Sequence, residues 1–139
     1  MPTLLLVDDD PAILSALVRL LRHEGYGILC AGNGSDGFAH LANHDVGVVV
    51  CDGLIQQMTG AEFLAVVQRE YPAVVRIMLT GYSDRDAVEQ ALRECDLFRF
   101  LTKPWDNQEL IDTLRAAFQA CAATRAGSAG AADSGLKCA

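Results

Sequence analysis

Residues 46–52, Val-Gly-Val-Val-Val-Cys-Asp, join an apolar run without polar alternation to an acid at its end. A strand that lacks alternation is typical of a parallel sheet that helices cover on both faces. Two further candidate strands also end in charged residues: Thr-Leu-Leu-Leu-Val-Asp-Asp at 3–9 and Leu-Phe-Arg-Phe-Leu-Thr-Lys at 97–103. We therefore expect an α/β fold in which charged side chains gather at the carboxyl ends of parallel strands.

The rest of the chain alternates strand and helix patterns, with apolar residues at helical spacing between the expected strands. Five βα units with right-handed crossovers predict a doubly wound sheet with helices on both faces. The flavodoxin-like order 2-1-3-4-5 is the usual one for five strands, although the sequence alone does not determine it. The last strand is the most polar and is expected at an edge. We expect strands at 3–7, 27–31, 46–51, 74–79 and 97–102, and helices beginning near residues 11, 35, 60, 84 and 107, the last ending near 122.

Size and charge exclude several classes of protein. A chain of 139 residues fits one domain, and 51% hydrophobic residues can fill its core. The net charge of −7 argues against nucleic-acid binding and against attraction to an anionic membrane surface. No apolar stretch approaches the ~20 residues that cross a bilayer, and Met1 leads directly into the first strand without room for a signal peptide. These features predict a cytoplasmic protein.

The cysteines do not indicate a metal site or a disulfide framework. Their number is odd and no two stand at metal-ligand spacing. We expect small buried residues in a reducing compartment. The five are Cys30, Cys51, Cys95, Cys121 and Cys138, of which Cys138 lies in the carboxyl-terminal tail and is the one most open to reaction.

The carboxyl-terminal segment differs in composition from the rest of the chain. From Thr124 onward it consists mainly of Ala, Gly and Ser without hydrophobic periodicity. Such a segment cannot bury a core of its own. We expect one domain at 1–123, followed at 124–139 by a disordered tail, a linker or an expression remnant.

Three acids are expected to meet at the carboxyl edge of the sheet. If strands one and three are neighbours, Asp8, Asp9 and Asp52 share one pocket. Three unpaired carboxylates repel one another, and a hard cation with oxygen ligands removes that penalty. The alternative is an acidic helix start, which the helix dipole favours. That alternative explains Asp10 but not acids that close apolar strands, so we predict a Mg²⁺ site.

Asp52 is the candidate nucleophile. A carboxylate can attack an electrophilic phosphorus while a cation and Lys103 hold the developing charge on the phosphoryl oxygens. Thr80 ends the fourth strand, and its hydroxyl could reach a phosphoryl oxygen. Taken singly, Thr80 also fits an ordinary turn and Lys103 a surface loop. Their combination with the acids at four strand ends predicts a site that accepts a phosphoryl group.

With these residues the chain resembles the receiver domains of response regulators in two-component signalling. The resemblance covers about residues 3–122. The matching motifs are Leu-Leu-Val-Asp-Asp-Asp at 5–10, Val-Cys-Asp at 50–52 with Gly60 eight residues further on, Met-Leu-Thr-Gly at 78–81, and Leu-Thr-Lys-Pro at 101–104.

The resemblance implies a Mg²⁺-dependent reaction in which a histidine kinase or a histidine phosphotransfer protein phosphorylates Asp52. Asp9 and Asp52 would bind Mg²⁺ directly, and Asp8 would act largely through water. The carbonyl oxygen of Leu54 would complete the protein ligands.

The resemblance also implies a switch. Thr80 and Lys103 would bind the phosphoryl group, and the peptide before Pro104 would be cis. Phe100 stands at the position of the switch aromatic, which turns inward as Thr80 moves and so changes the face formed by the fourth helix, fifth strand and fifth helix. Because phenylalanine lacks the hydroxyl of tyrosine, its inward state costs less desolvation. We therefore expect the unphosphorylated domain to sample that state.

Some positions depart from the family. Most members carry Met-Pro three and four residues after the phosphorylated Asp, where this chain has Ile55 and Gln56. Gly53, directly after the nucleophile, adds backbone freedom, so a mobile loop is expected here. Leu54 and Tyr82 flank the path of an attacking water and offer no base. We therefore expect slow autodephosphorylation by a phosphoacceptor that is not an enzyme in the usual sense.

Two alternatives stay open. A receiver-like interaction module would keep the fold without phosphorylation; the intact set of site residues argues against it, while the altered loop argues for it. A haloacid dehalogenase-type hydrolase needs a second acid two residues after the nucleophile, and Leu54 occupies that place.

The segment 98–106, Phe-Arg-Phe-Leu-Thr-Lys-Pro-Trp-Asp, resembles a subgroup of receivers. Members of this subgroup precede AAA+ transcription activators or cyclic-di-nucleotide phosphodiesterase domains. The kinase or phosphotransfer protein is the expected partner. An output domain after residue 124 and a homodimer are left open, and neither nucleic acid nor membrane is expected to bind directly.

Overall fold

The computed structural model describes residues 2–81 and 85–132. Its centre is a five-stranded sheet of order β2-β1-β3-β6-β7 in which each strand pair is parallel. This is the predicted flavodoxin-like order 2-1-3-4-5 for the five long strands, and the last of them lies at an edge as expected. The strands are β1 (Thr3–Val7), β2 (Gly27–Ala31), β3 (Val48–Cys51), β6 (Val75–Gly81) and β7 (Arg99–Lys103).

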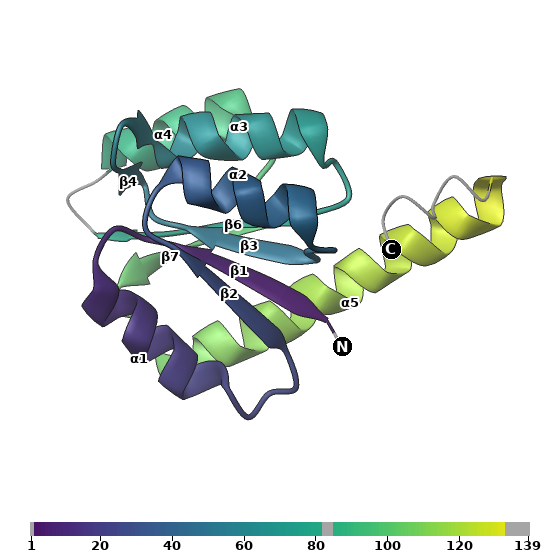
Figure 1. Cartoon of the computed structure of the whole chain (residues 1–139), viewed down its shortest axis with the longest axis horizontal. Coiled ribbons are helices and arrows are strands. Elements are labelled where there is room, and N and C mark those ends of the chain that lie inside the picture. The colour runs from purple at the N-terminus through teal and green to yellow at the C-terminus, as the bar shows by residue number, and fades with distance from the viewer. Residues whose placement is uncertain (1, 82–84, 133–139) are drawn as a thin grey trace.

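Helices cover both faces of this sheet (Figure 1). Along β1, Leu4 and Leu6 point to one face, whereas Leu5 and Val7 point to the other, so each face contributes to its own apolar cluster. The Leu4 and Leu6 face packs against α1 and α5, and the opposite face packs against α2, α3 and α4. The helices are α1 (Pro11–Leu21), α2 (Gly34–Asn43), α3 (Gly60–Glu70), α4 (Arg85–Glu94) and α5 (Asn107–Ala132).

A small hairpin that the sequence did not predict lies between β3 and α3. Its strands, β4 (Leu54–Ile55) and β5 (Met58–Thr59), pair antiparallel. Gln57, in the turn between them, has a φ of 72°. Glycine or asparagine is the usual residue in this left-handed conformation. The turn therefore carries no recognisable sequence signal, and only a loop was expected here.

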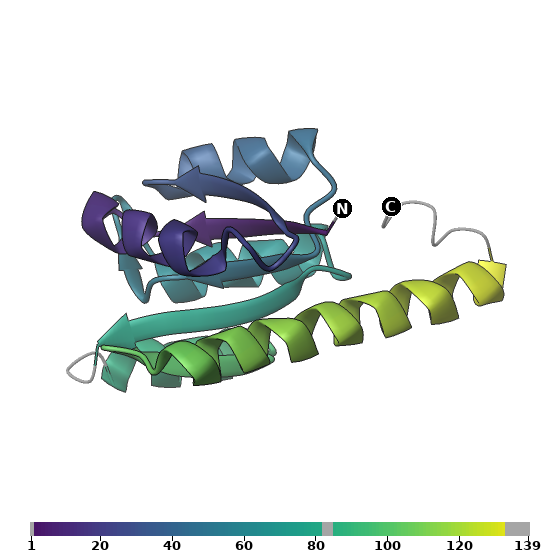
Figure 2. The same ribbon diagram turned by 90° about the horizontal axis from the view of Figure 1, so that it is seen from below.

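Helix α5 continues to Ala132, well beyond the end predicted near residue 122 (Figure 2). Its backbone is helical over residues 124–132, where a disordered tail was expected. Alanine is the best helix former, and a helix whose early turns are packed needs no new nucleation. Within the described residues no helix, α5 included, is long and apolar enough to cross a membrane. Residues 133–139, with Cys138, lie outside the description, and the domain boundary at residue 123 stays a prediction.

The cysteines follow the expectation with one exception. Cys51, Cys95 and Cys121 are buried, whereas Cys30 is exposed. Cys30 lies opposite Leu6 in the parallel register of β2 and β1. Because β2 is an edge strand, the helix that covers Leu6 leaves the side chain of Cys30 open to solvent.

Candidate functional site

The predicted site residues meet at the carboxyl edge of the sheet. Val7 and Cys51 lie opposite each other in the pairing of β1 and β3, so the acids that follow them emerge side by side. The backbone N–H of Asp52 also donates to the carbonyl of Val7 at 2.9 Å. Lys103 is the last residue of β7, at the same edge. The strand register therefore brings together residues far apart in the chain, as the sequence predicted.

The β1–α1 loop is held by its own acids. Asp8 is only 3% exposed, and its Oδ1 accepts a hydrogen bond from the backbone N–H of Asp10 at 2.9 Å. The side chain of Asp10 in turn caps α1 by accepting from the N–H of Ala12 at 2.9 Å, and Pro11 begins the helix. Asp9 lies between them and is exposed. Asp10 is thus a helix cap, while Asp8 and Asp9 are left for the site.

Three carboxylates and one ammonium form the centre of the site. Oxygens of Asp8, Asp9 and Asp52 all lie within 4.8 Å of one another. The Nζ of Lys103 lies 2.7 Å from Asp8 Oδ2 and 3.4 Å from Asp52 Oδ2. The peptide between Lys103 and Pro104 is cis, as the resemblance implied. One lysine cannot balance three carboxylates, so the cluster keeps an excess of negative charge.

Burial and mutual repulsion shift the ionisation of these groups. The pKa of Asp52 is raised, first by burial and then by the charge of Asp8; Lys103 and a backbone hydrogen bond from Gly53 oppose this shift. Burial alone would lower the pKa of Lys103, but its hydrogen bond to Asp8 and the charges of both carboxylates outweigh burial and raise it. Lys103 is therefore a firmly protonated cation, whereas ionisation of Asp52 is less favourable in the folded protein than in water.

This donor set fits Mg²⁺. Hard cations take oxygen ligands, and a magnesium site with few protein ligands keeps several waters. Asp9 is exposed and Asp52 is partly exposed, so both can share an ion with solvent, whereas Asp8 is buried and bound to Lys103. A divalent cation would also balance the excess negative charge of the cluster.

Two glycines bring the β3–α3 loop close to the backbone of Asp52. The N–H of Gly60 donates to the carbonyl of Gly53 at 2.8 Å, and a Cβ added to Gly60 would overlap the backbone carbonyl of Asp52. Thr59 and Glu62 form a capping box at the start of α3, with hydrogen bonds of 3.0 and 2.8 Å. The spacing Thr-x-x-Glu at 59–62 is the sequence signal of this cap, which was not predicted.

The remaining predicted residues differ in exposure. Thr80 is buried at 1% exposure, whereas Phe100 on the edge strand β7 is 46% exposed. Leu54 begins β4 and is 53% exposed. Tyr82, the second residue expected to flank the water path, lies outside the described residues. Of the two residues predicted to form the switch, Thr80 is therefore buried and Phe100 is partly exposed.

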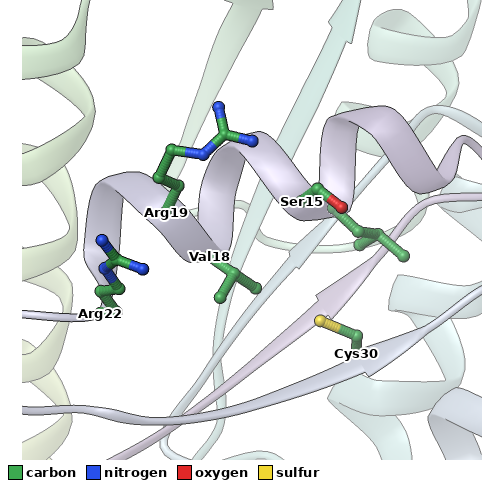
Figure 3. A pocket seen from close by; sticks show the side chains of 6 residues that line it. Ser15, Val18, Arg19, Arg22 and Cys30 are labelled. Atoms are coloured by element: carbon green, nitrogen blue, oxygen red, sulfur yellow. The ribbon is translucent and has the colours of Figure 1, made fainter.

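A separate hollow of about 300 Å³ lies between α1 and the edge strand β2 (Figure 3). None of the predicted site residues lines it, so it is distinct from the acidic cluster. Its lining residues are Leu14, Ser15, Val18, Arg19, Arg22 and Cys30.

Curated proteins are similar in sequence to most of this chain. The chain is 34% identical over 117 residues to the hydrogenase transcriptional regulatory protein HoxA of Bradyrhizobium diazoefficiens, covering 84% of this chain and 24% of that protein. It is 38% identical over 112 residues to the transcriptional regulatory protein GlrR of Escherichia coli, covering 80% and 25%. The chain therefore spans about a quarter of the length of these curated relatives.

A solved structure supports the same assignment. The signal receiver domain of an HD domain-containing protein from Pseudomonas fluorescens superposes with a TM-score of 0.86 at 35% identity, covering 89% of this chain and 91% of that one. The family model described as "Response regulator receiver domain" matches residues 4–115, a range that includes Asp8, Asp52 and Lys103. The chain belongs to the response regulator receiver domain family of two-component signalling.

Proposed function

We propose that Asp52 is the phosphoacceptor of this receiver domain and that the donor is a phosphohistidine on a histidine kinase or a phosphotransfer protein. The observation that carries the proposal is the cluster of Asp8, Asp9 and Asp52 within 4.8 Å, with Lys103 bound to two of its members. A receiver-like module without phosphorylation would have no need for this costly concentration of like charge.

The proposed transfer is a single displacement at phosphorus. A carboxylate oxygen of Asp52 attacks in line, an O–P bond forms, and the N–P bond to the imidazole breaks. The imidazole leaves with the electron pair of that bond and takes up a proton from solvent. The product on Asp52 is an acyl phosphate.

The neighbours of Asp52 would prepare this step. A bound Mg²⁺ would supply positive charge to the phosphoryl oxygens, held by Asp9, Asp52 and the carbonyl of Leu54, with Asp8 acting through water. Lys103, which pairs with Asp8 and Asp52 before the reaction, would turn its ammonium to a phosphoryl oxygen. This lysine therefore exchanges one anionic partner for another and stays charged throughout.

Thr80 and Phe100 would transmit the effect of phosphorylation from the site to the surface of the domain. Movement of the Thr80 hydroxyl towards the phosphoryl group would vacate space that the ring of Phe100 can enter. Because Phe100 is 46% exposed on β7, an inward turn of its ring would remove apolar surface from water. The face formed by α4, β7 and α5 would change with it and act on an output domain or a second copy of the chain.

Acetyl phosphate provides the direct test. The protein is incubated with Mg²⁺ and acetyl phosphate, and its intact mass is measured beside that of Asp52→Asn. We expect a gain of one phosphoryl group that is absent from the variant and absent with a chelator. No gain and no Mg²⁺ binding would instead support the interaction module; no gain despite Mg²⁺ binding would point to a strict requirement for the cognate kinase.

Hydrolysis of the acyl phosphate is proposed to be slow. Leu54 stands two residues after the phosphoacceptor and offers neither a base nor a hydrogen bond to an attacking water. Replacing it with asparagine would orient that water, so Leu54→Asn should shorten the phosphoryl half-life. Decay followed by intact mass measures the effect, and an unchanged half-life would contradict this explanation.

We also propose an output domain, a lack of direct nucleic-acid binding and a cellular location for this receiver domain. The curated relatives are about four times as long as the matched region, which supports an output domain after residue 124. The net charge of −7 disfavours direct binding of nucleic acid by the receiver itself. A cytoplasmic location is proposed because a histidine kinase draws its phosphate from ATP.

A further inference from the structure

Gly53, directly after the proposed phosphoacceptor, is required for space and not for backbone conformation. Its φ is not positive, since Gly25 is the glycine with positive φ among the described residues. A Cβ added to Gly53 would lie 2.8 Å from the Oγ1 of Thr80 and 3.0 Å from the Cβ of Ala87. The first contact is closer than real Cβ atoms approach other atoms, and the second is at that limit. Any side chain here would displace at least one neighbour.

The three residues join three separate elements. Gly53 follows β3, Thr80 lies near the end of β6, and Ala87 lies in the first turn of α4. All three are buried, with Thr80 at 1% and Ala87 at 8% exposure. We call this set the Gly53–Thr80–Ala87 contact. Through this contact the backbone next to Asp52 packs against α4, with only the small side chains of Thr80 and Ala87 between them.

The opposite end of α4 is fastened to the rest of the fold. The backbone N–H of Asp96 donates to Oε1 of Gln68 on α3 at 2.6 Å, and its carbonyl accepts from Nε of Arg76 on β6 at 2.9 Å. Cys95, at the end of α4, is buried in the core. The carboxyl end of α4 is therefore held by two elements, and its amino end rests on the Gly53–Thr80–Ala87 contact.

We propose that Gly53 is a positioning residue that couples α4 to the phosphorylation site. Because Gly53 has no side chain, Thr80 and Ala87 can pack directly beside the phosphoacceptor. A displacement of Thr80 would therefore shift the amino end of α4 directly. A side chain at position 53 would hold the Thr80 hydroxyl or α4 away from this place. The inference rests on the proposed phosphorylation of Asp52 and adds to it the route by which α4 responds.

The test compares Gly53→Ala with Gly32→Ala in the full chain. An added Cβ at Gly32 meets nothing within 4 Å, so this variant controls for the change of glycine to alanine. The readouts are the Mg²⁺ dissociation constant by isothermal titration, phosphorylation by acetyl phosphate by intact mass, and backbone amide NMR shifts. Melting curves establish that each variant folds.

For Gly53→Ala we expect Mg²⁺ binding to be retained, because the change removes no metal ligand. We expect shifted amide signals at Thr80 and in the first turn of α4. Phosphorylation should slow by roughly tenfold, since a misplacement of about 1 Å can cost up to 100-fold. Adding Ala87→Gly to Gly53→Ala opens space on the α4 side and should restore much of the rate. Gly32→Ala should match the wild type in each readout.

Wild-type rates together with unshifted Thr80 and α4 signals in Gly53→Ala would overturn the proposal. A slow rate that Ala87→Gly does not restore would also overturn it, because the effect would then not pass through α4. If Gly53→Ala does not fold, Ala87→Val adds bulk from the α4 side and must shift the same amides. Failure of wild-type phosphorylation would count against the proposed function alone, since the NMR shifts of the unphosphorylated variants still report on the Gly53–Thr80–Ala87 contact.

Discussion

The two loops that bring acids to the site are built in different ways. The β1–α1 loop is short and makes its own hydrogen bonds: Asp8 accepts from the N–H of Asp10, and Asp10 caps α1. The β3–α3 loop contains a hairpin and depends on close backbone approach, because Gly60 lies against the carbonyl of Asp52 and Gly53 lies against Thr80. Local hydrogen bonding shapes the first loop, and the space allowed by distant parts of the fold shapes the second.

Gly60→Ala should have the largest effect, because it attacks the close approach in the β3–α3 loop. The new Cβ would overlap the backbone carbonyl of Asp52, and neither of these groups can swing away like the end of a side chain. We expect a loss of about 3 kcal/mol in the free energy of unfolding, at the upper end of overpacking costs.

Urea denaturation measures this loss, and phosphorylation should fall with it. Gly32→Ala serves as the control because its Cβ would lie in open space. Equal free energies of unfolding for the two variants would show that the close approach of Gly60 to Asp52 does not constrain the β3–α3 loop.

Asp9→Asn tests the use of the β1–α1 loop for metal. It removes one carboxylate of the acidic cluster, so the Mg²⁺ dissociation constant should rise roughly tenfold, or about 1.4 kcal/mol. Without Mg²⁺ the same change relieves repulsion and should raise the melting temperature. Asp10→Asn is the matched control, since asparagine still caps a helix. Similar losses of Mg²⁺ affinity in the two variants would contradict the division of roles between cap and ligand.

Thr59→Ala compares the helix caps that end the two loops. Thr59 accepts from the N–H of Glu62 at the start of α3, and its loss should cost about 1 kcal/mol in the free energy of unfolding. Asp10→Ala at the start of α1 should cost a similar amount, because it also removes a side-chain cap. Urea denaturation of both variants sharpens the comparison: a much larger cost for Thr59→Ala would show that the hairpin depends on this cap.

The smallest expected effect concerns the charge of Asp52 without metal. Burial raises its pKa, so the carboxylate ionises less readily in the folded protein than in the unfolded chain. Folding stability is therefore lost as the pH rises from the unfolded pKa through the folded pKa, and the full loss in the free energy of unfolding is present above the folded pKa. In a chelator, Asp52→Asn should melt at a higher temperature than the wild type at pH 7. That difference should shrink as the pH falls towards 4, and a constant difference would contradict the assigned cause.

Local signals predicted much of this protein. The apolar run at 46–52 indicated a buried parallel strand, and Asp10-Pro11 indicated the start of α1; both are confirmed. The hairpin escaped prediction because Gln57 adopts a positive φ without the usual glycine. Cys30 was expected to be buried because it stands in an apolar segment, but β2 lies at an edge of the sheet and its side chain is exposed.

The sequence by itself determined the five βα units and the acids and lysine at the strand ends, because hydrophobic periodicity and charge are properties of neighbouring residues. Tertiary structure alone decided the distances between these groups. The register of β1 against β3 set the carboxylates of Asp8 and Asp52 beside each other, and β7 at the edge brought Lys103 to within 2.7 Å of Asp8. Likewise, the need for glycine at position 53 comes from Thr80 and Ala87, which lie far along the chain. Distances between such residues depend on how whole elements pack, and no local pattern encodes them.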